Sequence, residues 1–412
     1  MFEKIAVDRG WRLIAPEPLA RPYDPLLELA DALDEAIDCE PVRDMFGKDS
    51  RVLVLVSDST RDFPKGLMFM ALREHLSHVP DENIEILVAC GIHRPLDVAD
   101  LGFSPEVLER YRVGYHDPTD FLSLAYIGTT RPKLVRYSLG LVGLPYAKLA
   151  FSPRLSAYLN HALLLGTPIW INRKLLEFDA VIAIGQIRPH YFFGFSGGAK
   201  SLVPGASGAV TVEINHSLRV FPTSRFGFVR GNPAREDAEE AAEMFGRLFV
   251  FNSILDATGG ICSAVFGRGM KAFMWGCERA KEAGRTKIER FDMVAVEAKG
   301  GMGTDLVQAQ KALAIAGYFA KEGGVILLGA PCTNGIGDVA KARTVFDFTV
   351  SRYIPDGVRI LLLAPAGIRD IRGLPFELVH SPDEAVRWTR TITRGEPEVG
   401  YIPDASIVWP EV

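Results

Sequence analysis

The stretch from Asp179 to Gly208 reads DAVIAIGQIRPHYFFGFSGGAKSLVPGASG, and it predicts a strand, a loop and a helix in succession. Residues 181–184 (VIAI) form the short apolar run expected of a strand buried on both faces, as in the parallel sheets of α/β proteins. The loop combines four glycines with a lysine. Glycines let backbone N–H groups approach an anion and a lysine adds positive charge, so this composition is typical of a phosphate site.

The loop departs from the Walker A motif and contains a histidine. Walker A places a glycine directly before its lysine, whereas Ala199 occupies that position here. His190 lies beside the glycines, and imidazole is a common ligand for nickel, zinc, copper and iron. We interpret His190 as a candidate ligand for the metal of a phosphate-bearing cofactor, and the alternative is a core histidine next to a tight turn. The candidate cofactor-binding residues of the loop are Ser196, Gly197, Gly198 and Lys200.

Composition limits the class of protein. The 412 residues are enough for two or three domains, and 48% apolar with 24% charged residues is typical of a globular chain. A net charge of −5 gives no reason to expect a nucleic-acid partner. The five cysteines are scattered and form no C-x-x-C pair, which favours a reducing compartment over a disulfide framework. We find no signal peptide or membrane span and expect a cytoplasmic protein.

Polar side chains follow two further strand candidates. The run RVLVLV ends in Asp58 and Arg61, and IEILVAC runs into His93. Ligand contacts gather at the carboxyl ends of parallel strands, so we expect the three side chains to lie close together. Arg61 suits a carboxylate or phosphate, and His93 could act as a base. Alternatively, Asp58 caps the next helix and His93 is a turn residue.

The second half of the chain repeats the α/β rhythm with strand candidates DMVAVEA, VILLGA and VRILLLA. We therefore predict an α/β protein of two domains, each built around a mostly parallel sheet with flanking helices. The N-terminal catalytic and cofactor-binding domain spans 1–275, with 396–412 docking back on it, and the C-terminal α/β domain spans 285–395. Gln308 and Lys311 are three residues apart on one helix face, which in isolation indicates a solvated surface.

Several of these segments resemble the nickel-dependent lactate racemase family in order along the chain. The segments are PHYFFGFSGGAKSLVPG, SDSTRDFP (57–64), GIHRP (91–95), GTPIWINRK (166–174) and the Gln308/Lys311 pair. The resemblance implies a nickel-pincer nucleotide cofactor with a protein histidine as a further nickel ligand. It also implies racemisation or epimerisation of a 2-hydroxy acid, an isomerase reaction in which a hydride moves to the cofactor and back.

The resemblance assigns roles to particular residues. It makes His190 the nickel ligand and His93 a proton-transfer histidine, and it brings Gln308 and Lys311 across an interdomain cleft that holds the active site. Lys174 corresponds to the lysine that carries a covalently attached cofactor in some members, although alone it indicates a solvated residue opening a helix. Asp58 and Arg61 complete the candidate catalytic residues. The partner is then a small-molecule substrate, with neither nucleic acid nor membrane, in a monomer or a homodimer.

The chain departs from the family pattern at one catalytic position. The second catalytic histidine of the family lies just before the GTP motif, where this chain has Leu165. Either His161, four residues earlier, takes that role, or the second acid–base group is missing. His116 is a weaker candidate. The alternatives to a racemase are a nucleotide-dependent kinase or transferase that uses the glycine loop, a zinc hydrolase or lyase, and a noncatalytic cofactor-binding homologue.

Overall fold

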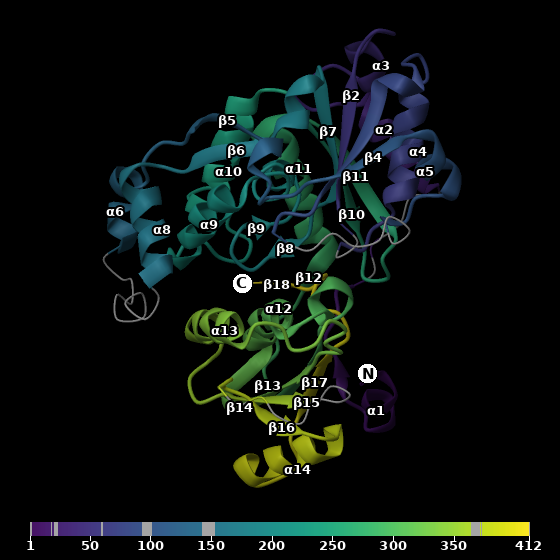
Figure 1. The fold of residues 1–412 in the computed structure, drawn as a ribbon. Helices are drawn as coiled ribbons and strands as arrows, with labels where there is room; N and C mark the ends of the chain where they lie inside the picture. The colour runs from purple at the N-terminus through teal and green to yellow at the C-terminus, as the bar shows by residue number, and fades with distance from the viewer. Residues whose placement is uncertain are drawn as a thin grey trace. The chain divides into compact units, whose positions relative to one another are not determined.

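The structure is a computed structural model that describes residues 2–17, 19, 24–58, 61–92, 101–141, 153–363, 371 and 373–411. The chain divides into two compact units. The larger comprises residues 20–255 and 259–280, and the smaller comprises residues 1–19, 256–258 and 281–412. The α/β fold with two main sheets agrees with the prediction (Figure 1).

The larger unit is built on a six-stranded sheet in the order β11-β10-β7-β2-β3-β4. Its strands are β2 (Val52–Ser57), β3 (Ile84–Ala89), β4 (Arg112–Tyr115), β7 (Ala180–Gln186), β10 (Leu248–Leu255) and β11 (Ile261–Gly267). Neighbouring strands are parallel except β10 and β11, which form an antiparallel pair. The VIAI run therefore lies in β7, near the centre of the sheet, where every residue is buried as predicted.

Helices lie on both sides of this sheet. The helices of the unit are α2 (Pro25–Asp34), α3 (Val42–Met45), α4 (Lys65–His75), α5 (Pro105–Arg110), α6 (Leu134–Leu141), α8 (Pro153–Leu164), α9 (Ala209–Ser217), α10 (Pro233–Phe245) and α11 (Gly269–Gly284), of which α6 and α8 lie away from the sheet (Figure 1). An apolar core joins α2 and α4 to one face, while α9, α10 and α11 lie on the other side (Figure 1). Two two-stranded antiparallel sheets complete the unit. One pairs β5 (Leu124–Thr129) with β6 (Pro168–Asn172), and the other is the hairpin of β8 (Pro189–His190) and β9 (Gly194–Phe195).

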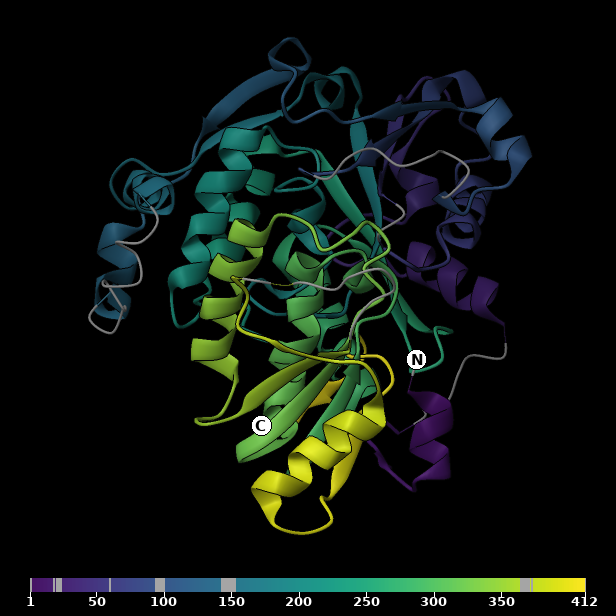
Figure 2. The same cartoon turned by 60° about the horizontal axis from the view of Figure 1, so that its bottom comes forward.

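The smaller unit contains a second six-stranded sheet in the order β1-β17-β13-β14-β15-β16, and all its pairs are parallel. The strands are β1 (Arg12–Leu13), β13 (Phe291–Glu297), β14 (Ala320–Gly329), β15 (Arg359–Leu363), β16 (Glu377–Val379) and β17 (Val399–Ile402). Helices α1 (Glu3–Asp8) and α14 (Pro382–Thr393) pack on one face, and α12 (Leu306–Ala316) and α13 (Val339–Tyr353) lie on the other (Figure 2). β12 (Arg285–Thr286) pairs separately with β18 (Trp409–Pro410).

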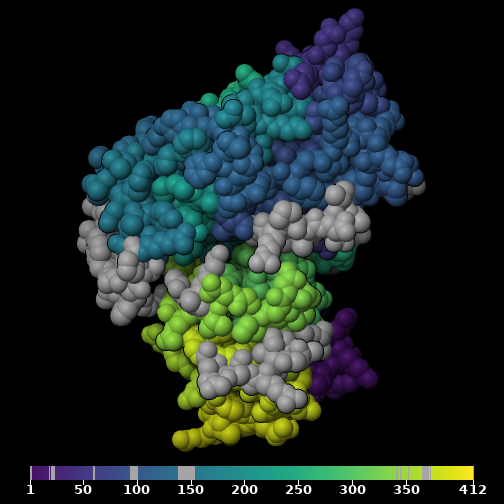
Figure 3. All heavy atoms as spheres, in the orientation of Figure 1, coloured from purple at the N-terminus to yellow at the C-terminus, as the bar shows by residue number. Residues whose placement is uncertain are grey.

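Both ends of the chain belong to the smaller unit, which corrects the predicted domain limits. Residues 396–412 belong to the smaller unit, in whose sheet β17 lies between β1 and β13. The N-terminal residues join the same unit through β1 and through the Phe2 amide, which donates to Glu297 Oε1 at 2.7 Å. Figure 3 shows these purple residues beside the green and yellow ones. Strand pairing between distant segments leaves no local signal. The sequence therefore did not reveal that both ends of the chain belong to the smaller unit.

Candidate functional site

The glycine-rich loop follows the carboxyl end of β7 and folds back as the β8/β9 hairpin. Gly197 and Gly198 have φ values of 75° and 62°, a conformation that side chains disfavour. A Cβ at Gly197 would lie 2.8 Å from Asn252 Oδ1, and one at Gly198 would lie 2.6 Å from the Phe273 ring. The Gly198 amide already donates to Asn252 Oδ1 at 3.0 Å. The glycine pair thus lets the loop pack on β10 and α11, and this amide is not directed at a phosphate.

Ser196 and Lys200 also have partners within the unit. The Ser196 hydroxyl donates to the Gln186 carbonyl at 2.9 Å and accepts from the Arg188 amide at 3.0 Å. These two bonds close the base of the loop. The Lys200 ammonium lies 5.2 Å from the centre of the Phe193 ring. Ser196, Gly197, Gly198 and Lys200 therefore all have partners or packing contacts within the unit, and their contact with a cofactor stays a prediction.

The His190 ring lies among three aromatic residues of its own loop. Its centroid is 5.0 Å from those of Tyr191 and Phe192 and 5.7 Å from that of Phe193. Its Nδ1 accepts from the Phe192 and Phe193 amides at 3.4 and 3.2 Å. A neutral imidazole that accepts at Nδ1 carries its proton on Nε2. Metal binding at Nε2 therefore requires that proton to leave and the two loop amides to turn away from Nδ1.

Arg235 holds this loop from α10, and the sequence interpretation missed it. The side chain is fully buried, and its guanidinium donates to the carbonyls of Phe193, Phe195 and Gly197. It also pairs with Glu239, one helical turn away, at 3.2 Å. Burial lowers the pKa of Arg235, and the Glu239 carboxylate opposes that shift. The helix is rich in charged residues, which do not by themselves indicate burial. The available signal was the stripe of small residues beside Arg235, namely Ala234, Ala238 and Ala241.

A second group of polar residues lies where β2 ends. Asp58 is buried, and its carbonyl accepts from the Arg61 amide at 3.2 Å. Lys65, the first residue of α4, is buried and donates to the Arg61 carbonyl. Burial lowers the pKa of Lys65 to about 8, while Asp58 and Asp62 act in the opposite direction. Burial likewise lowers the pKa of Arg61, against the attraction of Asp58.

His93 lies outside the described residues, so its place beside Asp58 and Arg61 stays a prediction. That prediction assumed that the two strands preceding these residues are parallel neighbours. β2 and β3 do pair in parallel, with Ser57 beside Ala89 at their carboxyl ends. Lys65 was not predicted as part of this group, since its position directly after Pro64 at a helix start gives no indication of burial.

The two other candidate histidines are tied to backbone carbonyls. His161 Nδ1 lies 2.8 Å from the Gly166 carbonyl, at the end of its own helix α8. His116 is buried, with Nε2 2.9 Å from the Ser207 carbonyl and Nδ1 3.2 Å from Asn172 Nδ2. Burial lowers the pKa of His116, so the neutral ring is favoured. These contacts give both histidines structural roles, and catalysis by His161 stays a prediction.

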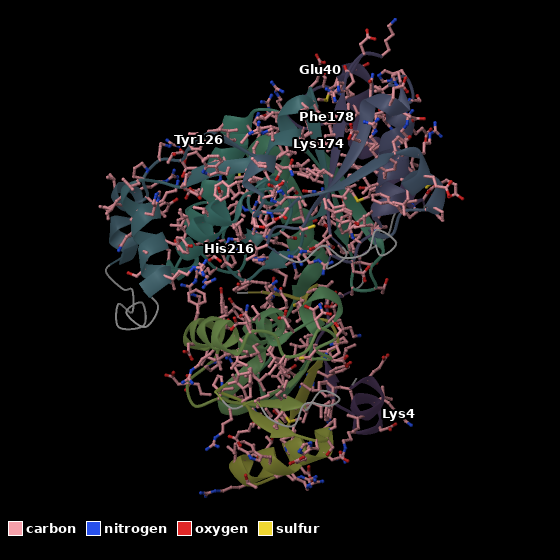
Figure 4. The ribbon with its side chains drawn as sticks, in the orientation of Figure 1. Lys4, Glu40, Tyr126, Lys174, Phe178 and His216 are labelled. Atoms are coloured by element: carbon pink, nitrogen blue, oxygen red, sulfur yellow. The ribbon has the colours of Figure 1, made fainter. Side chains whose placement is uncertain are left out.

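The structure does not bring Lys174 together with His190. The Lys174 ammonium pairs with Glu85, the second residue of β3, near the amino-terminal ends of the strands. His190 follows the carboxyl end of β7 instead. Figure 4 shows Lys174 beside Phe178 and well away from His216, which lies at the end of α9. The geometry therefore opposes covalent attachment at Lys174.

Gln308 and Lys311 lie on one face of α12, as their spacing predicted. The Lys311 ammonium donates to Gln308 Oε1 at 2.5 Å, and the Gln308 amide donates to Asp305 Oδ1 at the start of the helix at 2.8 Å. Both residues belong to the smaller unit, whereas the loop and Asp58 belong to the larger one. Their meeting at one active site stays a prediction.

The donor set around His190 suits a metal that brings its own ligands. Among the described residues, no three histidine, cysteine or acidic side chains gather where they could hold a metal ion. A catalytic zinc ion normally takes three protein ligands. A nickel-pincer nucleotide supplies sulfur and carbon ligands itself and needs a single histidine. The described residues therefore fit the cofactor, with the Nδ1 rearrangement noted above, and do not provide a site for a bare zinc ion.

Fold and loop together define an α/β protein with a histidine-bearing glycine loop at the carboxyl end of a parallel sheet. The family profile described as the lactate racemase N-terminal domain matches residues 3–134 and 158–227. The chain belongs to the lactate racemase family.

Two proteins named lactate racemase are similar to this chain over 313 residues. The one from Thermoanaerobacterium thermosaccharolyticum is 27% identical and the one from Lactiplantibacillus plantarum 28%, each match covering 74% of this chain. The matched region spans 66% of each relative's own length, slightly less than two thirds.

Two solved structures share the fold. The lactate racemase apoprotein from T. thermosaccharolyticum superposes with a TM-score of 0.76 at 21% identity, covering 98% of this chain and 96% of that one. A protein from Thermotoga maritima superposes with a TM-score of 0.67 at 18% identity, covering 97% of this chain and 100% of that one. In the part of the chain that the structure describes, no helix is both long and apolar enough to cross a bilayer.

Proposed function

We propose that the protein is a racemase or epimerase of a small 2-hydroxy acid that works with a nickel-pincer nucleotide. The observation that carries the proposal is the His190 loop in a chain of the lactate racemase family; among the described residues no group of three metal-ligating side chains offers another metal site. When bound, the cofactor supplies a hydride acceptor for the C2 hydrogen of the substrate. The cytoplasmic location and the possible homodimer stay predictions.

The residues at the end of β2 match the needs of a hydroxy-acid substrate. A carboxylate needs a cation, and a guanidinium can bind both of its oxygens. Arg61 is the proposed carboxylate ligand, with Lys311 as the second cation. Asp58 belongs to the same cluster, and its carboxylate opposes the lowering of the Arg61 pKa by burial. His93 is the proposed base for the hydroxyl proton, since imidazole titrates close to neutral pH.

The rival functions have less support. A kinase or transferase would use the glycine amides for phosphate, yet the Gly198 amide donates to Asn252. A zinc hydrolase or lyase would need protein ligands that are not gathered in the described residues. A noncatalytic homologue would bind the cofactor without converting any hydroxy acid, so an activity measurement distinguishes it.

The experiment uses protein produced in cells that synthesise the nickel cofactor. Enantiopure 2-hydroxy acids, beginning with both lactate enantiomers and continuing through longer and dicarboxylic members, are incubated with it. The other stereoisomer is measured by chiral chromatography. Conversion in both directions, abolished in Arg61→Met, supports the proposal. Nickel-loaded protein that converts none of them would leave the noncatalytic alternative.

A further inference from the structure

We propose that His216 is the second proton-transfer residue, in the role that His161 was expected to take. The inference rests on the proposed function, because a racemase that passes through a planar 2-oxo acid needs a proton-transfer group for each of two faces. His93 serves one face. Leu165 occupies the position where the family pattern has the other histidine, so this chain must supply that group from elsewhere.

His216 lies on the same aromatic residues as the His190 ring. Its centroid is 5.1 Å from that of Phe192 and 5.7 Å from that of Phe193. His190 contacts the same two rings at 5.0 and 5.7 Å. The two imidazoles are therefore no more than about 10 Å apart, since each lies about 5 Å from Phe192. A small substrate beside a metal held by His190 would lie within reach of His216.

A rigid frame holds both histidines in place. The side chain of Asn215, next to His216, donates to the Ala234 carbonyl and to Asp237 Oδ2, both at 2.9 Å. These bonds fix the end of α9 to α10. The same helix holds the His190 loop through Arg235. The distance between the two imidazoles is thus set by buried hydrogen bonds to one helix, as positioned proton transfer requires.

The other described histidines of the larger unit are engaged elsewhere. His75 Nδ1 lies 2.8 Å from the Ala71 carbonyl, and His78 Nε2 lies 2.7 Å from the Phe46 carbonyl. His116 and His161 bind the Ser207 and Gly166 carbonyls. None of these four has a ring contact with the His190 loop among those the structure describes, whereas His216 has two.

The proton step is balanced in each direction. In oxidation, the hydroxyl O–H bond breaks, its electron pair forms the carbonyl, and the proton passes to an imidazole nitrogen. The C2 hydride would leave to the acceptor that a bound cofactor would supply. In the return step, hydride adds to the other face and the second imidazole returns a proton to the oxygen. His93 performs one proton transfer and His216 the other, so each histidine serves one enantiomer.

The test replaces His216 by Phe, which keeps a ring against Phe192 and Phe193, and by Asn. Both variants are made with the nickel cofactor and given each enantiomer of an acid that the wild-type protein converts. We expect nickel content to equal that of wild type. One enantiomer should still be oxidised to the 2-oxo acid, while oxidation of the other falls by roughly a hundredfold or more. The matched control is His78→Asn, which should retain both reactions.

A binding measurement provides a readout that does not depend on turnover. The ring signals of His216, assigned by their loss in His216→Asn, are followed by NMR in apoprotein as the corresponding 2-oxo acid is added. Movement of these signals supports the proposal. Two rate results would overturn the proposal: oxidation of both enantiomers falls equally in the His216 variants, or oxidation of neither falls. Ring signals that do not move would also overturn it. So would a fall in the oxidation of a single enantiomer that is seen in His161→Asn instead. If the wild-type protein converts no hydroxy acid, the proposed function fails first, and unmoved ring signals then overturn the His216 assignment separately.

Discussion

The Arg235 guanidinium and the Glu239 carboxylate form a buried ion pair of 3.2 Å in α10, and the same guanidinium holds three carbonyls of the loop that carries His190. A charge buried this completely is stable only while all of its partners are present. The conformation of the His190 loop therefore depends on the packing of α10 and on the ion pair within it.

Replacing Arg235 by Met should destabilise the larger unit by about 3–5 kcal/mol, because it leaves the Glu239 carboxylate and three carbonyls without their donor. The free energy of unfolding is measured by urea titration of the apoprotein. The double variant Arg235→Met/Glu239→Leu should recover part of that loss, since it removes the uncompensated charge. A single variant as stable as wild type would contradict the role assigned to Arg235.

The strands were predictable from the sequence, whereas the burial of Arg235 in this helix was not, for one physical reason. The buried run of β7 and the cap of α10 are local patterns, and Asn232 does accept from the Arg235 amide at the start of that helix. Burial of Arg235 depends on carbonyls about forty residues away. The placement of β17 depends on a strand more than one hundred residues away. Long-range pairing of this kind has no periodicity that a single sequence can display.

The candidate site was predictable to a similar extent. The family pattern and the strand ends pointed to Asp58, Arg61 and His190 as candidates, and their roles stay predictions. Lys65 and His216 escaped notice because their environment is made by other elements. Lys174 was expected beside the cofactor from its spacing to His190, and it pairs with Glu85 instead. The spacing misled because β7 runs between the two residues and separates them along its whole length.

His116 should make stability depend on pH on the acid side of neutrality. Burial lowers the pKa of His116 below its ordinary value of 6.5. On acidification the imidazole is therefore protonated at a higher pH in the unfolded chain than in the folded protein. The resulting loss of stability begins as pH falls through about 6.5 and can reach roughly 1.4 kcal/mol per pH unit. Unfolding free energies between about pH 7 and pH 5 should fall less steeply in His116→Gln than in wild type. Parallel profiles would count against a buried neutral ring.

The cofactor should not be attached through Lys174. The peptide that contains this residue should have its unmodified mass after digestion of nickel-loaded protein. Lys174→Met should bind nickel as wild type does, and it should lose about 1–2 kcal/mol of stability, because Glu85 loses a partner that is itself partly exposed. Glu85→Gln/Lys174→Met serves as the matched control and should restore part of that stability. Cofactor mass on Lys174 would disprove noncovalent binding.

The most direct test of the whole account is the nickel content of wild-type and His190→Ala protein, purified in parallel from cells that synthesise the cofactor, with His78→Ala as the control. Because His190 is the proposed protein ligand, wild type and the control should carry close to one nickel per chain, and His190→Ala should remain folded by circular dichroism while losing nearly all of it. Undiminished nickel in folded His190→Ala would show that the metal is held elsewhere and would contradict the central claim.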